Sequence, residues 1–569
     1  MRIFTTGAGL GLALVATGTT HAQSITTLVL EGDTVAGVGD VTTIGNIDVN
    51  NNGDWVVEVD TNNPVIDDDN AIIANGVMVY QENQSLAAPP GTNLDGFDSM
   101  SLNEANRFSS NWTLAGTSGS SDNSGLFFDG VLMIQEGTVS TAAGFSAGTV
   151  YTGYFETYNT DNNAFMVLAS IDDPLIAGTT NRGLVLITHD GAGNLVSETV
   201  LYKETDLLPG QTELLDDFQT GQHDLDYSQN GHVAFIADLL GDTSVDSAIY
   251  VDGTLIAQEG SDSGVVPGTN WSSGLSSSVL DVNNLGQLIF HGDLDTVSSE
   301  DRVIVFDGTI IAREGTGHPD IPAGTVFTSF GSGPVYCSDN GDTVFYGDWD
   351  DADTDIDTGL FINGELVVQE GVTMIGGLVV DTLRGVSDGF RMSDDGRYVV
   401  FEAILEGGLE GAFLIDRGPR PTTICLGDGS GTACPCVNES ALGAGEGCSN
   451  SQGHGAILSV AGSLTVAGAD TVFSATQARP SQPGMLVQGV NLIGIPFKDG
   501  ILCMGAPTER VEVAFTDVNG DAATLGDIAT LGNVSPGDTR HYQYWYRDPN
   551  ISPCGFGSNF SQGLTIEWQ

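Results

Sequence analysis

One short pattern recurs along this chain and constrains its fold more than any other feature. It reads "GLFFDGVLMIQEG" at 125–137, "AIYVDGTLIAQEG" at 248–260, "VIVFDGTIIAREG" at 303–315 and "GLFINGELVVQEG" at 359–371. In each copy two apolar runs flank Asp-Gly or Asn-Gly. This pair is the strongest short signal for a β-hairpin with a type I′ turn, because both central residues of that turn need positive φ. Each copy therefore predicts two antiparallel strands followed by a Glu.

A second pair of strands precedes each hairpin. A short apolar run ends at an Asx or Gly turn, and the run after the turn alternates apolar and polar residues, which is the period of a half-buried strand. We name the four strands of a unit A to D. Seven such turns with their runs occur, mostly 54 to 56 residues apart: 48–60, 102–115, 158–170, 227–238, 281–293, 337–348 and 392–403.

Repeated units of four antiparallel strands are typical of the blades of a β-propeller. The last unit ends with a strand C, "EGAFLIDRG" at 410–418, and has no strand D. The segment "TTLVLEGDTVAG" at 27–38 matches strand D and has no strand C before it. Pairing these two strands would remove exposed sheet edges. We therefore predict an all-β fold with a seven-bladed propeller over 25–418, closed by its N-terminal strand.

The pattern changes after the repeats. The Pro-containing segment 419–424 predicts a linker, and 425–569 holds short apolar strands between Gly, Asn and Ser turns. This segment predicts a small β-sandwich-like module stapled by disulfides.

Six of the seven cysteines lie in that module: Cys425, Cys434, Cys436, Cys448, Cys503 and Cys554. In an exported chain they predict three disulfides; a metal site is the alternative, but Cys434-Pro-Cys436 lacks the C-x-x-C spacing. The spacing does not decide the pairing. As a prediction we join sequence neighbours, Cys425–Cys434, Cys436–Cys448 and Cys503–Cys554. Cys337 is left as a buried free thiol.

Residues 1–22 have the features of a secretory signal peptide. Arg2 is followed by an apolar run over 8–18, and Thr20-His21-Ala22 predicts cleavage after Ala22. No later run of about 20 apolar residues occurs, so no membrane span is predicted. We expect a secreted, extracellular or cell-surface protein.

The charge balance restricts the partners. The chain has 75 acidic and 16 basic residues, a net charge of −59. A nucleic-acid-binding protein needs the opposite sign, and an anionic membrane surface is disfavoured for the same reason. Such a charge favours solubility or the collection of cations. We expect a monomer whose partner is an extracellular protein or a glycan.

One Glu follows strand D in every blade. These residues are Glu31, Glu82, Glu136, Glu204, Glu259, Glu314 and Glu370. Strand order puts them at the outer rim of the face that carries the long B–C and D–A loops. Our interpretation is structural: each carboxylate accepts N–H bonds from the "PGT"-type turn that follows. A ring of cation ligands is the alternative.

One acidic loop is a candidate calcium site. The segment "DWDDADTDIDTG" at 348–359 contains Asp351, Asp353, Asp355 and Asp357. Alternate Asp oxygens suit Ca²⁺, although such a run is commonly only a solvated loop. No other cofactor is predicted.

The C-terminal residues "CPCVN", "GCSNSQGHGA", "YQYWYRDP" and "LTIEW" resemble a module that ends many secreted proteins of planctomycete-type bacteria. The unit "DGxLxxQEG", followed by "PGT" and "NxxG", resembles repeat proteins of unknown function from similar bacteria. The resemblance covers most of the chain. It implies a secreted or surface protein, and it brings no activity and no catalytic residues.

Two functions follow from these observations. No nucleophile-elbow, zinc-protease, P-loop or dinucleotide motif is present, so no catalytic residue is predicted. The first hypothesis is a non-catalytic interaction or structural protein that uses the loop-bearing face of the propeller. The alternative is an extracellular polysaccharide-acting hydrolase or lyase with its site at the channel mouth. An enzyme should break the sevenfold regularity there with a deep polar cleft.

Overall fold

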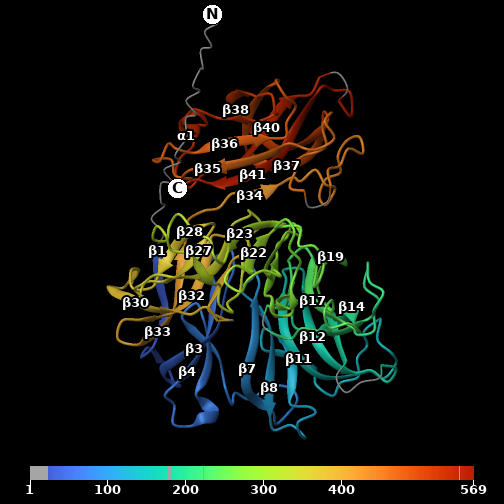
Figure 1. The fold of residues 1–569 in the computed structure, drawn as a ribbon, viewed down its shortest axis with the longest axis vertical. Coiled ribbons are helices and arrows are strands. Elements are labelled where there is room, and N and C mark those ends of the chain that lie inside the picture. The colour runs from blue at the N-terminus through green and yellow to red at the C-terminus, as the bar shows by residue number, and fades with distance from the viewer. Residues whose placement is uncertain (1–23, 177–180, 222, 387, 442–443, 550–551) are drawn as a thin grey trace, which may run out of the picture.

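The computed structural model describes residues 24–176, 181–221, 223–386, 388–441, 444–549 and 552–569. The predicted signal peptide, 1–22, lies outside them. The described chain forms a ring of sheets with a smaller β domain stacked on one of its faces (Figure 1). Seven sheets of the described residues form the ring, and this confirms the predicted all-β propeller class. No helix of the described part is long and apolar enough to cross a membrane.

The first four blades follow the predicted order A to D from the axis outward. Blade 1 contains β2 (Thr34–Val35), β3 (Gly39–Val49), β4 (Trp55–Thr61), β5 (Asn70–Ala74) and β6 (Val77–Gln81), with a 3-10 turn η1 (Ile66–Asp68). Blade 2 contains β7 (Asn93–Leu102), β8 (Phe108–Ala115), β9 (Ser124–Phe128) and β10 (Val131–Gln135). Blade 3 contains β11 (Val150–Asn159), β12 (Ala164–Asp172), β13 (Asn181–His189) and β14 (Leu195–Lys203). Blade 4 contains β15 (Leu215–Phe218), β16 (Leu225–Tyr227), β17 (Val233–Leu239), β18 (Ser247–Val251) and β19 (Thr254–Gln258).

The other three blades complete the ring. Blade 5 contains β20 (Leu280–Val282), β21 (Leu288–Asp293), β22 (Arg302–Phe306) and β23 (Thr309–Arg313), preceded by η2 (Ser273–Ser277). Blade 6 contains β24 (Phe327–Ser329), β25 (Tyr336–Cys337), β26 (Thr343–Trp349), β27 (Thr358–Ile362) and β28 (Glu365–Gln369). Blade 7 contains β29 (Met374–Ile375), β30 (Leu378–Leu383), β31 (Phe390–Met392), β32 (Tyr398–Leu405), β33 (Leu409–Asp416) and β1 (Ser24–Leu30).

The outer hairpins have the predicted turn chemistry. Both central residues have positive φ in five C–D turns: Asn75-Gly76, Asp129-Gly130, Asp252-Gly253, Asp307-Gly308 and Asn363-Gly364. This confirms the type I′ turns, since Asn and Asp tolerate the left-handed conformation and Gly adopts it without strain.

The N-terminal strand closes the ring. β1 pairs antiparallel with β33, from Ser24 opposite Asp416 to Leu30 opposite Gly411. Val29, 3% exposed, packs in one apolar cluster with Val57 of blade 1 and Val400 of blade 7. The closing strand therefore joins the first blade to the last through both backbone pairing and apolar burial.

Hydrogen bonds also join the A–B turns around the ring. At each junction a backbone N–H of one turn donates to an oxygen of the next turn, which explains why Asn and Asp recur at these positions. The bonds are Asn51 N to Glu104 Oε1, Glu104 N to Asp161 Oδ1, Asp161 N to Gln229 Oε1, Asn230 N to Asn284 Oδ1, Asn284 N to Asp339 Oδ1, Asp339 N to Asp394 O and Asp395 N to Asn51 Oδ1.

The C-terminal domain has two sheets around one core, as predicted for the module. One sheet has the order β34 (Thr422–Ile424), β41 (Ser558–Glu567), β40 (Thr539–Arg547), β37 (Pro483–Phe497) and β38 (Gly500–Phe515). The other has β35 (Ile457–Ala461), β36 (Val472–Thr476) and β39 (Ala522–Ala523), and α1 (Ile528–Leu531) follows. The motif residues Tyr542 and Trp568 belong to this core, where Trp568 Nε1 donates to the Tyr542 hydroxyl at 3.0 Å.

Three disulfides are present, but the predicted pairing is wrong at all three. The bonds are Cys425–Cys503, Cys434–Cys448 and Cys436–Cys554. Two of them join cysteines 78 and 118 positions apart. The physical reason is the long β37–β38 hairpin and the order of the sheet, which bring distant segments beside the start of the domain. Cys337 is a buried free cysteine, as predicted.

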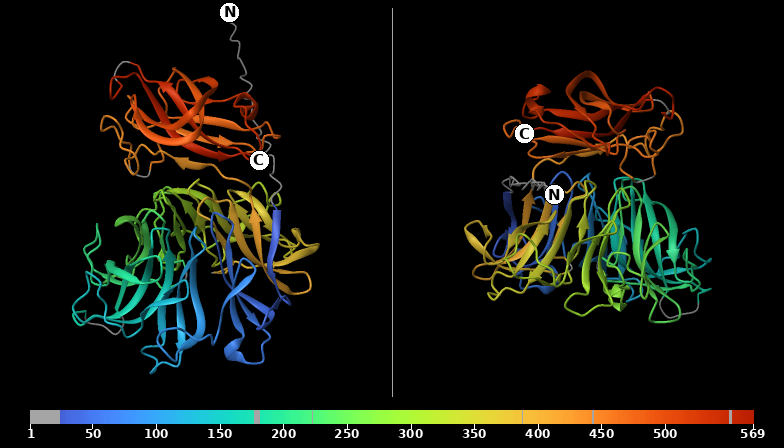
Figure 2. Two further views of the ribbon diagram at one scale, coloured as in Figure 1. Left: turned by 180° about the vertical axis from the view of Figure 1, so that it is seen from behind. Right: turned by 45° about the horizontal axis from the view of Figure 1, so that its top comes forward.

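The C-terminal domain lies over the face formed by the A–B turns, which we call the turn face (Figure 2). A pocket between the two domains is lined by Asn230 and Asn284 of these turns and by residues of 423–431. The predicted linker 419–424 needs correction, because β34 lies inside it and pairs with β41. The segment joining the domains is therefore shorter than predicted. The opposite face, which we call the loop face, carries the B–C and D–A loops.

Candidate functional site

The repeated Glu residues lie at the ends of the outermost strands on the loop face. Each backbone N–H bonds to the start of strand C in its own blade, for example Glu259 N to Ser247 O at 2.9 Å. Four of the seven are less than one-tenth exposed: Glu136, Glu204, Glu259 and Glu314. Burial of this kind accords with a structural role.

The predicted partners of these carboxylates are wrong. In the described residues they do not accept N–H bonds from the turn that follows; they face the start of strand C in their own blade. Thr358 Oγ1 donates to Glu370 Oε2 at 2.5 Å, and Ser124 Oγ donates to Glu136 Oε2 at 3.2 Å. The strand preceding each Glu runs back along strand C, so the side chain reaches that strand before it reaches the next blade.

In four blades the Glu faces an Asp thirteen positions earlier. The pairs are Glu82 with Asp69, Glu259 with Asp246, Glu314 with Asp301 and Glu370 with Asp357. Burial, followed by the nearby carboxylates, raises the pKa of Glu82 to about 7. The same causes raise the pKa of Glu259. Blade 2 differs, because Asn123 stands at the Asp position and its amide, in the flipped orientation, donates to Glu136 Oε2 at 3.2 Å.

The acidic loop of blade 6 uses part of its own oxygen set. Asp351 Oδ1 accepts from Asp353 N at 3.0 Å, and Asp353 Oδ1 accepts from Asp355 N at 3.4 Å. Within the described ranges no group of three or more His, Cys, Asp or Glu side chains is arranged to hold a metal ion. Calcium at this loop stays a prediction.

The axis of the propeller carries a polar layer that breaks the sevenfold regularity. Each innermost strand contributes one side chain, two positions before its A–B turn. In blade order these are Asp48, Ser101, Tyr158, Asp226, Asp281, Tyr336 and Arg391. We call them the axial layer.

Several axial side chains bond to the neighbouring blade. Asp48 Oδ2 accepts from Leu102 N at 2.7 Å, Asp226 Oδ2 from Val282 N at 2.8 Å, and Asp281 Oδ2 from Cys337 N at 2.8 Å. Arg391 Nε lies 2.9 Å from Asp48 Oδ1, which joins blade 7 to blade 1. The layer therefore holds blades together as well as lining the channel.

A cavity of about 70 Å³ lies between the axial layer and the A–B turns. Its outer wall includes Glu104, Asp339 and Asp394. Burial and the surrounding carboxylates raise the pKa of Glu104 to about 7. We call this space the channel cavity.

A second group of carboxyls lies on the loop-face side of the axial layer, on three adjacent blades. Asp98, Glu156 and Asp224 come from strand A of blade 2, strand A of blade 3 and the segment before β16. Burial raises the pKa of Glu156 to about 8, and the charges of Asp388, Asp98 and Asp224 add to the shift while Arg391 opposes it. Burial also raises the pKa of Asp224 to about 6. We call this group the channel mouth.

Blade 7 adds a charged cluster on the same face. Arg384 Nε lies 3.1 Å from Glu402 Oε1, and Arg384 Nη2 lies 2.9 Å from Glu410 Oε1. Burial, and the hydrogen bond between the two carboxyls, raise the pKa of Glu402 well above its ordinary value. Glu156 and Glu402 thus both favour the protonated form near neutral pH.

The sequence reasoning missed both the axial layer and the channel mouth. These residues lie in the innermost strands, or directly before one, and no motif of their own marks them. A signal was available in the repeat alignment, because Asp226, Asp281 and Arg391 put charges into the innermost apolar strand at one shared position. The broken regularity expected at the channel is present there, whereas the repeated Glu residues lie far from the axis.

Comparisons with known proteins add no assignment. No protein-family model matches the chain, and no match was found among curated proteins. The β-propeller domain of the Trilobed protease from Pyrococcus furiosus is 10% identical, with 66% of this chain and 95% of that one covered and a TM-score of 0.31. An oligogalacturonate lyase in complex with manganese is 12% identical, with 67% of this chain and 98% of that one covered and a TM-score of 0.29. An α-L-arabinanase of Penicillium chrysogenum complexed with arabinobiose is 11% identical, with 58% of this chain and 94% of that one covered and a TM-score of 0.28. At these values the likeness says nothing about activity.

Proposed function

We propose that this is a secreted or cell-surface binding protein that holds its ligand at the loop face of the propeller. One observation carries the proposal: carboxyls on three adjacent blades converge on the channel mouth, while the C-terminal domain occupies the opposite face. Three disulfides support an oxidising, extracellular setting.

The charge of the propeller supports a ligand without acidic groups. Residues 425–569 contain 13 acidic and 5 basic residues, so 62 acidic and 11 basic residues lie before them. A polyanionic glycan would be repelled by such a surface. Neutral or amino sugars suit it, because carboxylates accept hydrogen bonds from hydroxyl and ammonium groups.

A glycan array tests this proposal. The mature protein should bind neutral or amino glycans and not uronates, and Glu156→Gln with Asp224→Asn should weaken that binding at least tenfold. Asp262→Asn is the matched control, because Asp262 is an exposed loop-face carboxylate away from the axis. Binding that the mouth variants leave intact would overturn the proposal. If the protein captured a protein partner and no glycan, the ligand would be a protein and the glycan proposal would be wrong.

Hydrolysis of a neutral glycan is the second candidate. The observation that favours it is the pair Glu156 and Asp224, whose raised pKa values differ, as the two carboxyls of a glycosidase differ. Glu156 would serve as general acid and Asp224 as base or nucleophile. Release of reducing ends by the wild type, abolished in Glu156→Gln with binding retained, would establish catalysis. Binding without turnover would exclude it for the glycans tested.

A further inference from the structure

The larger sheet of the C-terminal domain packs one of its faces in the core and presents part of the other to solvent. Leu486 of β37 and Tyr544 of β40 belong to the core. Successive residues of a strand point to opposite faces, so Met485 and Trp545 lie on the other face. Met485 pairs with Trp545 on one side and with Val513 of β38 on the other. These three side chains therefore form an apolar row across β40, β37 and β38.

This apolar row is open to solvent beside the edge strand β38. Val513 is 57% exposed, and Phe515, two positions further along β38, is 69% exposed. On the other side of Trp545, Phe560 of β41 is 4% exposed, so the same face is covered there. A contiguous exposed apolar patch marks an interaction site. We call this surface the open sheet face; it consists of Met485, Arg510, Val513, Phe515, Trp545 and Arg547.

The two arginines stand at diagonally opposite corners of the open sheet face. Arg547 is two positions after Trp545 on β40, and Arg510 pairs with Val487, which is two positions after Met485 on β37. A spacing of two keeps side chains on one face of a sheet. Both arginines are exposed, and neither side chain has an ion-pair or hydrogen-bond partner among the described residues.

Free cations are rare in this chain, whose net charge is −59. In the propeller every described arginine and lysine has an acidic partner. The acids nearest to Arg510 in the sequence, Glu509 and Glu512, accept hydrogen bonds on the opposite face of the sheet. The unpaired Arg510 and Arg547 therefore favour an anionic partner by charge complementarity.

The side chains between the arginines indicate the class of partner. Met485, Val513 and Phe515 offer no hydrogen-bonding group, so the hydroxyls of a glycan would lose hydrogen bonds to water without replacement. Apolar side chains of a protein would instead bury the exposed surface, and Trp, Phe, Met and Arg are the residue types enriched at protein–protein interfaces. A second copy docked by the same face would bring four guanidinium groups together without a carboxylate.

We infer that the open sheet face binds an acidic segment of another protein, with apolar side chains over Trp545 and Phe515 and carboxylates on Arg510 and Arg547. An Arg–carboxylate pair is frequently bidentate, which adds geometric specificity. The C-terminal domain is stacked on the ring on the side away from the loop face (Figure 1). Attachment through this domain would therefore leave the channel mouth free, and the inference does not depend on the ligand proposed for the loop face.

Three labelled peptides test the open sheet face in the full mature chain. The first alternates Glu and Leu, the second has Gln in place of every Glu, and the third has Ser in place of every Leu. Fluorescence anisotropy should show at least tenfold tighter binding of the Glu-Leu peptide than of either control, because the face needs both carboxylates and apolar side chains. No binding of the Glu-Leu peptide, or equal binding of the three peptides, would overturn the inference.

Surface variants locate the binding. Arg510→Gln combined with Arg547→Gln should weaken binding of the Glu-Leu peptide at least tenfold, and so should Phe515→Ser. Lys498→Gln is the matched control, because it removes a cation of the same domain at the tip of the β37–β38 hairpin, outside the open sheet face. It should bind like the wild type.

All the substituted side chains are exposed, so the variants should fold, and their melting temperatures check this. Undiminished peptide binding by the double arginine variant would contradict the inference. Tighter binding of dextran sulfate than of the Glu-Leu peptide would assign the face to a glycan instead. A dimer in sedimentation velocity that the double arginine variant loses would assign it to a second copy, and either result would overturn the acidic protein partner.

Discussion

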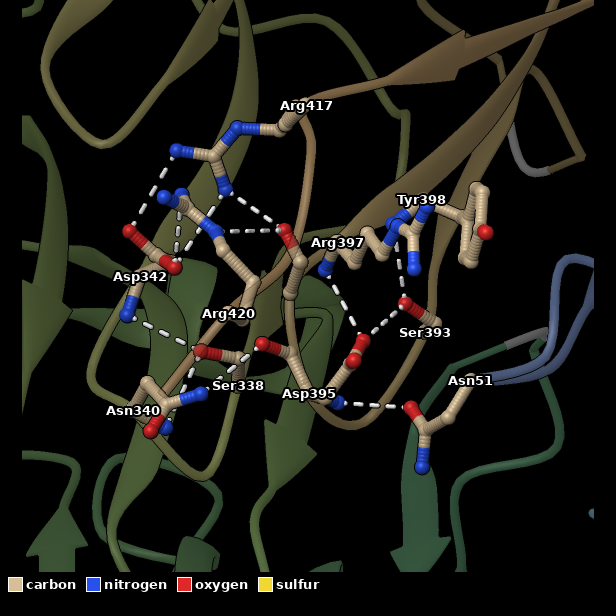
Figure 3. A network of polar contacts seen from close by, with 11 residues as sticks. Asn51, Ser338, Asn340, Asp342, Ser393, Asp395, Arg397, Tyr398, Arg417 and Arg420 are labelled. Carbon is tan, nitrogen blue, oxygen red and sulfur yellow. Dashed lines mark hydrogen bonds and ion pairs between the residues drawn. The ribbon is translucent and has the colours of Figure 1, made fainter. Parts of the chain in front are cut away.

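Arg420 Nη2 lies 2.9 Å from Asp342 Oδ2, and this contact binds the start of the C-terminal domain to blade 6. Arg417 shares the same carboxylate at 3.3 Å and donates from Nη1 to Gly396 O at 2.7 Å, in the A–B turn of blade 7 (Figure 3). In the same turn, Asp395 N donates to Asn51 Oδ1 of blade 1. One carboxylate therefore anchors two arginines at the seam where the ring closes.

Asp342→Ala should destabilise the protein by about 3 kcal/mol or more. Removal of the carboxylate leaves two largely buried guanidinium groups with Gly396 O as an acceptor but without their anionic partner. Breaking a buried ion pair from one side costs about 3–5 kcal/mol. Urea unfolding followed by tryptophan fluorescence measures the change. Asp67→Ala, which removes an exposed acid from η1, should lie within about 0.5 kcal/mol of the wild type. Equal stability of the two variants would show that the arginines find other partners.

Deletion of residues 25–38 should open the ring. It removes β1 and leaves β33 without its partner, and it exposes the apolar cluster around Val57 and Val400. We expect the calorimetric transition of the propeller to move down and lose cooperativity, while the C-terminal domain keeps its own transition. A truncated protein that melts like the intact one would refute closure by the N-terminal strand.

Glu259→Gln and Glu136→Gln should have opposite effects. Glu259 faces Asp246, so a neutral amide relieves repulsion, and the variant should gain stability at pH 8. Glu136 accepts from Ser124 and, in the flipped orientation, from the Asn123 amide; its variant weakens these bonds and should lose about 1 kcal/mol. Melting at pH 8 and pH 5.5 measures both. Destabilisation by both substitutions would mean that the Glu–Asp pairs are not repulsive.

The wild type should melt at a higher temperature at pH 5.5 than at pH 8. The folded-state pKa of Glu82 and of Glu204 is raised to about 7, against an ordinary value of 4.5. A raised carboxyl pKa means that the folded state binds more protons than the unfolded state. The stability gained from this proton binding is fully present below about pH 4.5 and is lost as the pH rises through about 7. Calorimetry at constant ionic strength measures it. A melting temperature that rises with pH across this window would contradict these shifts.

Peptide mapping without reduction should recover the bonds Cys425–Cys503, Cys434–Cys448 and Cys436–Cys554. Alkylation should label Cys337 only after unfolding, because it is buried. Peptides joined as sequence neighbours, Cys425 with Cys434 for instance, would contradict the arrangement of the C-terminal domain.

The propeller could be predicted because its information is local and repeated. Period-two runs and Asx-Gly turns each specify a hairpin, and an unpaired strand at each end, such as β1 and β33, indicates closure. The disulfides could not be predicted in the same way. Cys436 and Cys554 meet only after the long β37–β38 hairpin and β40 have taken their places in the sheet, and nothing near either cysteine records that order.

The candidate sites were harder to predict, because the role of each axial side chain depends on the residues at the same position in the other six blades. Asp226 and Asp281 are ordinary acids in the sequence; they become a buried pair because successive blades turn the same position towards one axis. The repeated Glu residues were conspicuous for the opposite reason. Their regularity reflects the hairpin they stabilise, and the functional candidates lie where the repeat stops being regular.

Closure by β1 also determines when the molecule can be finished. Ser24 and Asp416 are 392 positions apart, so the earliest described strand has no partner until blade 7 exists. During synthesis from the N-terminus, β1 stays unpaired while the first six blades form. Its pairing with β33 then closes a very long loop, which carries a large entropic cost. Arg417 and Arg420 come directly after β33, the strand with which β1 pairs. The contacts that hold the C-terminal domain therefore form only where blade 7 is completed. Docking of that domain requires a propeller whose N-terminal and C-terminal strands have already paired.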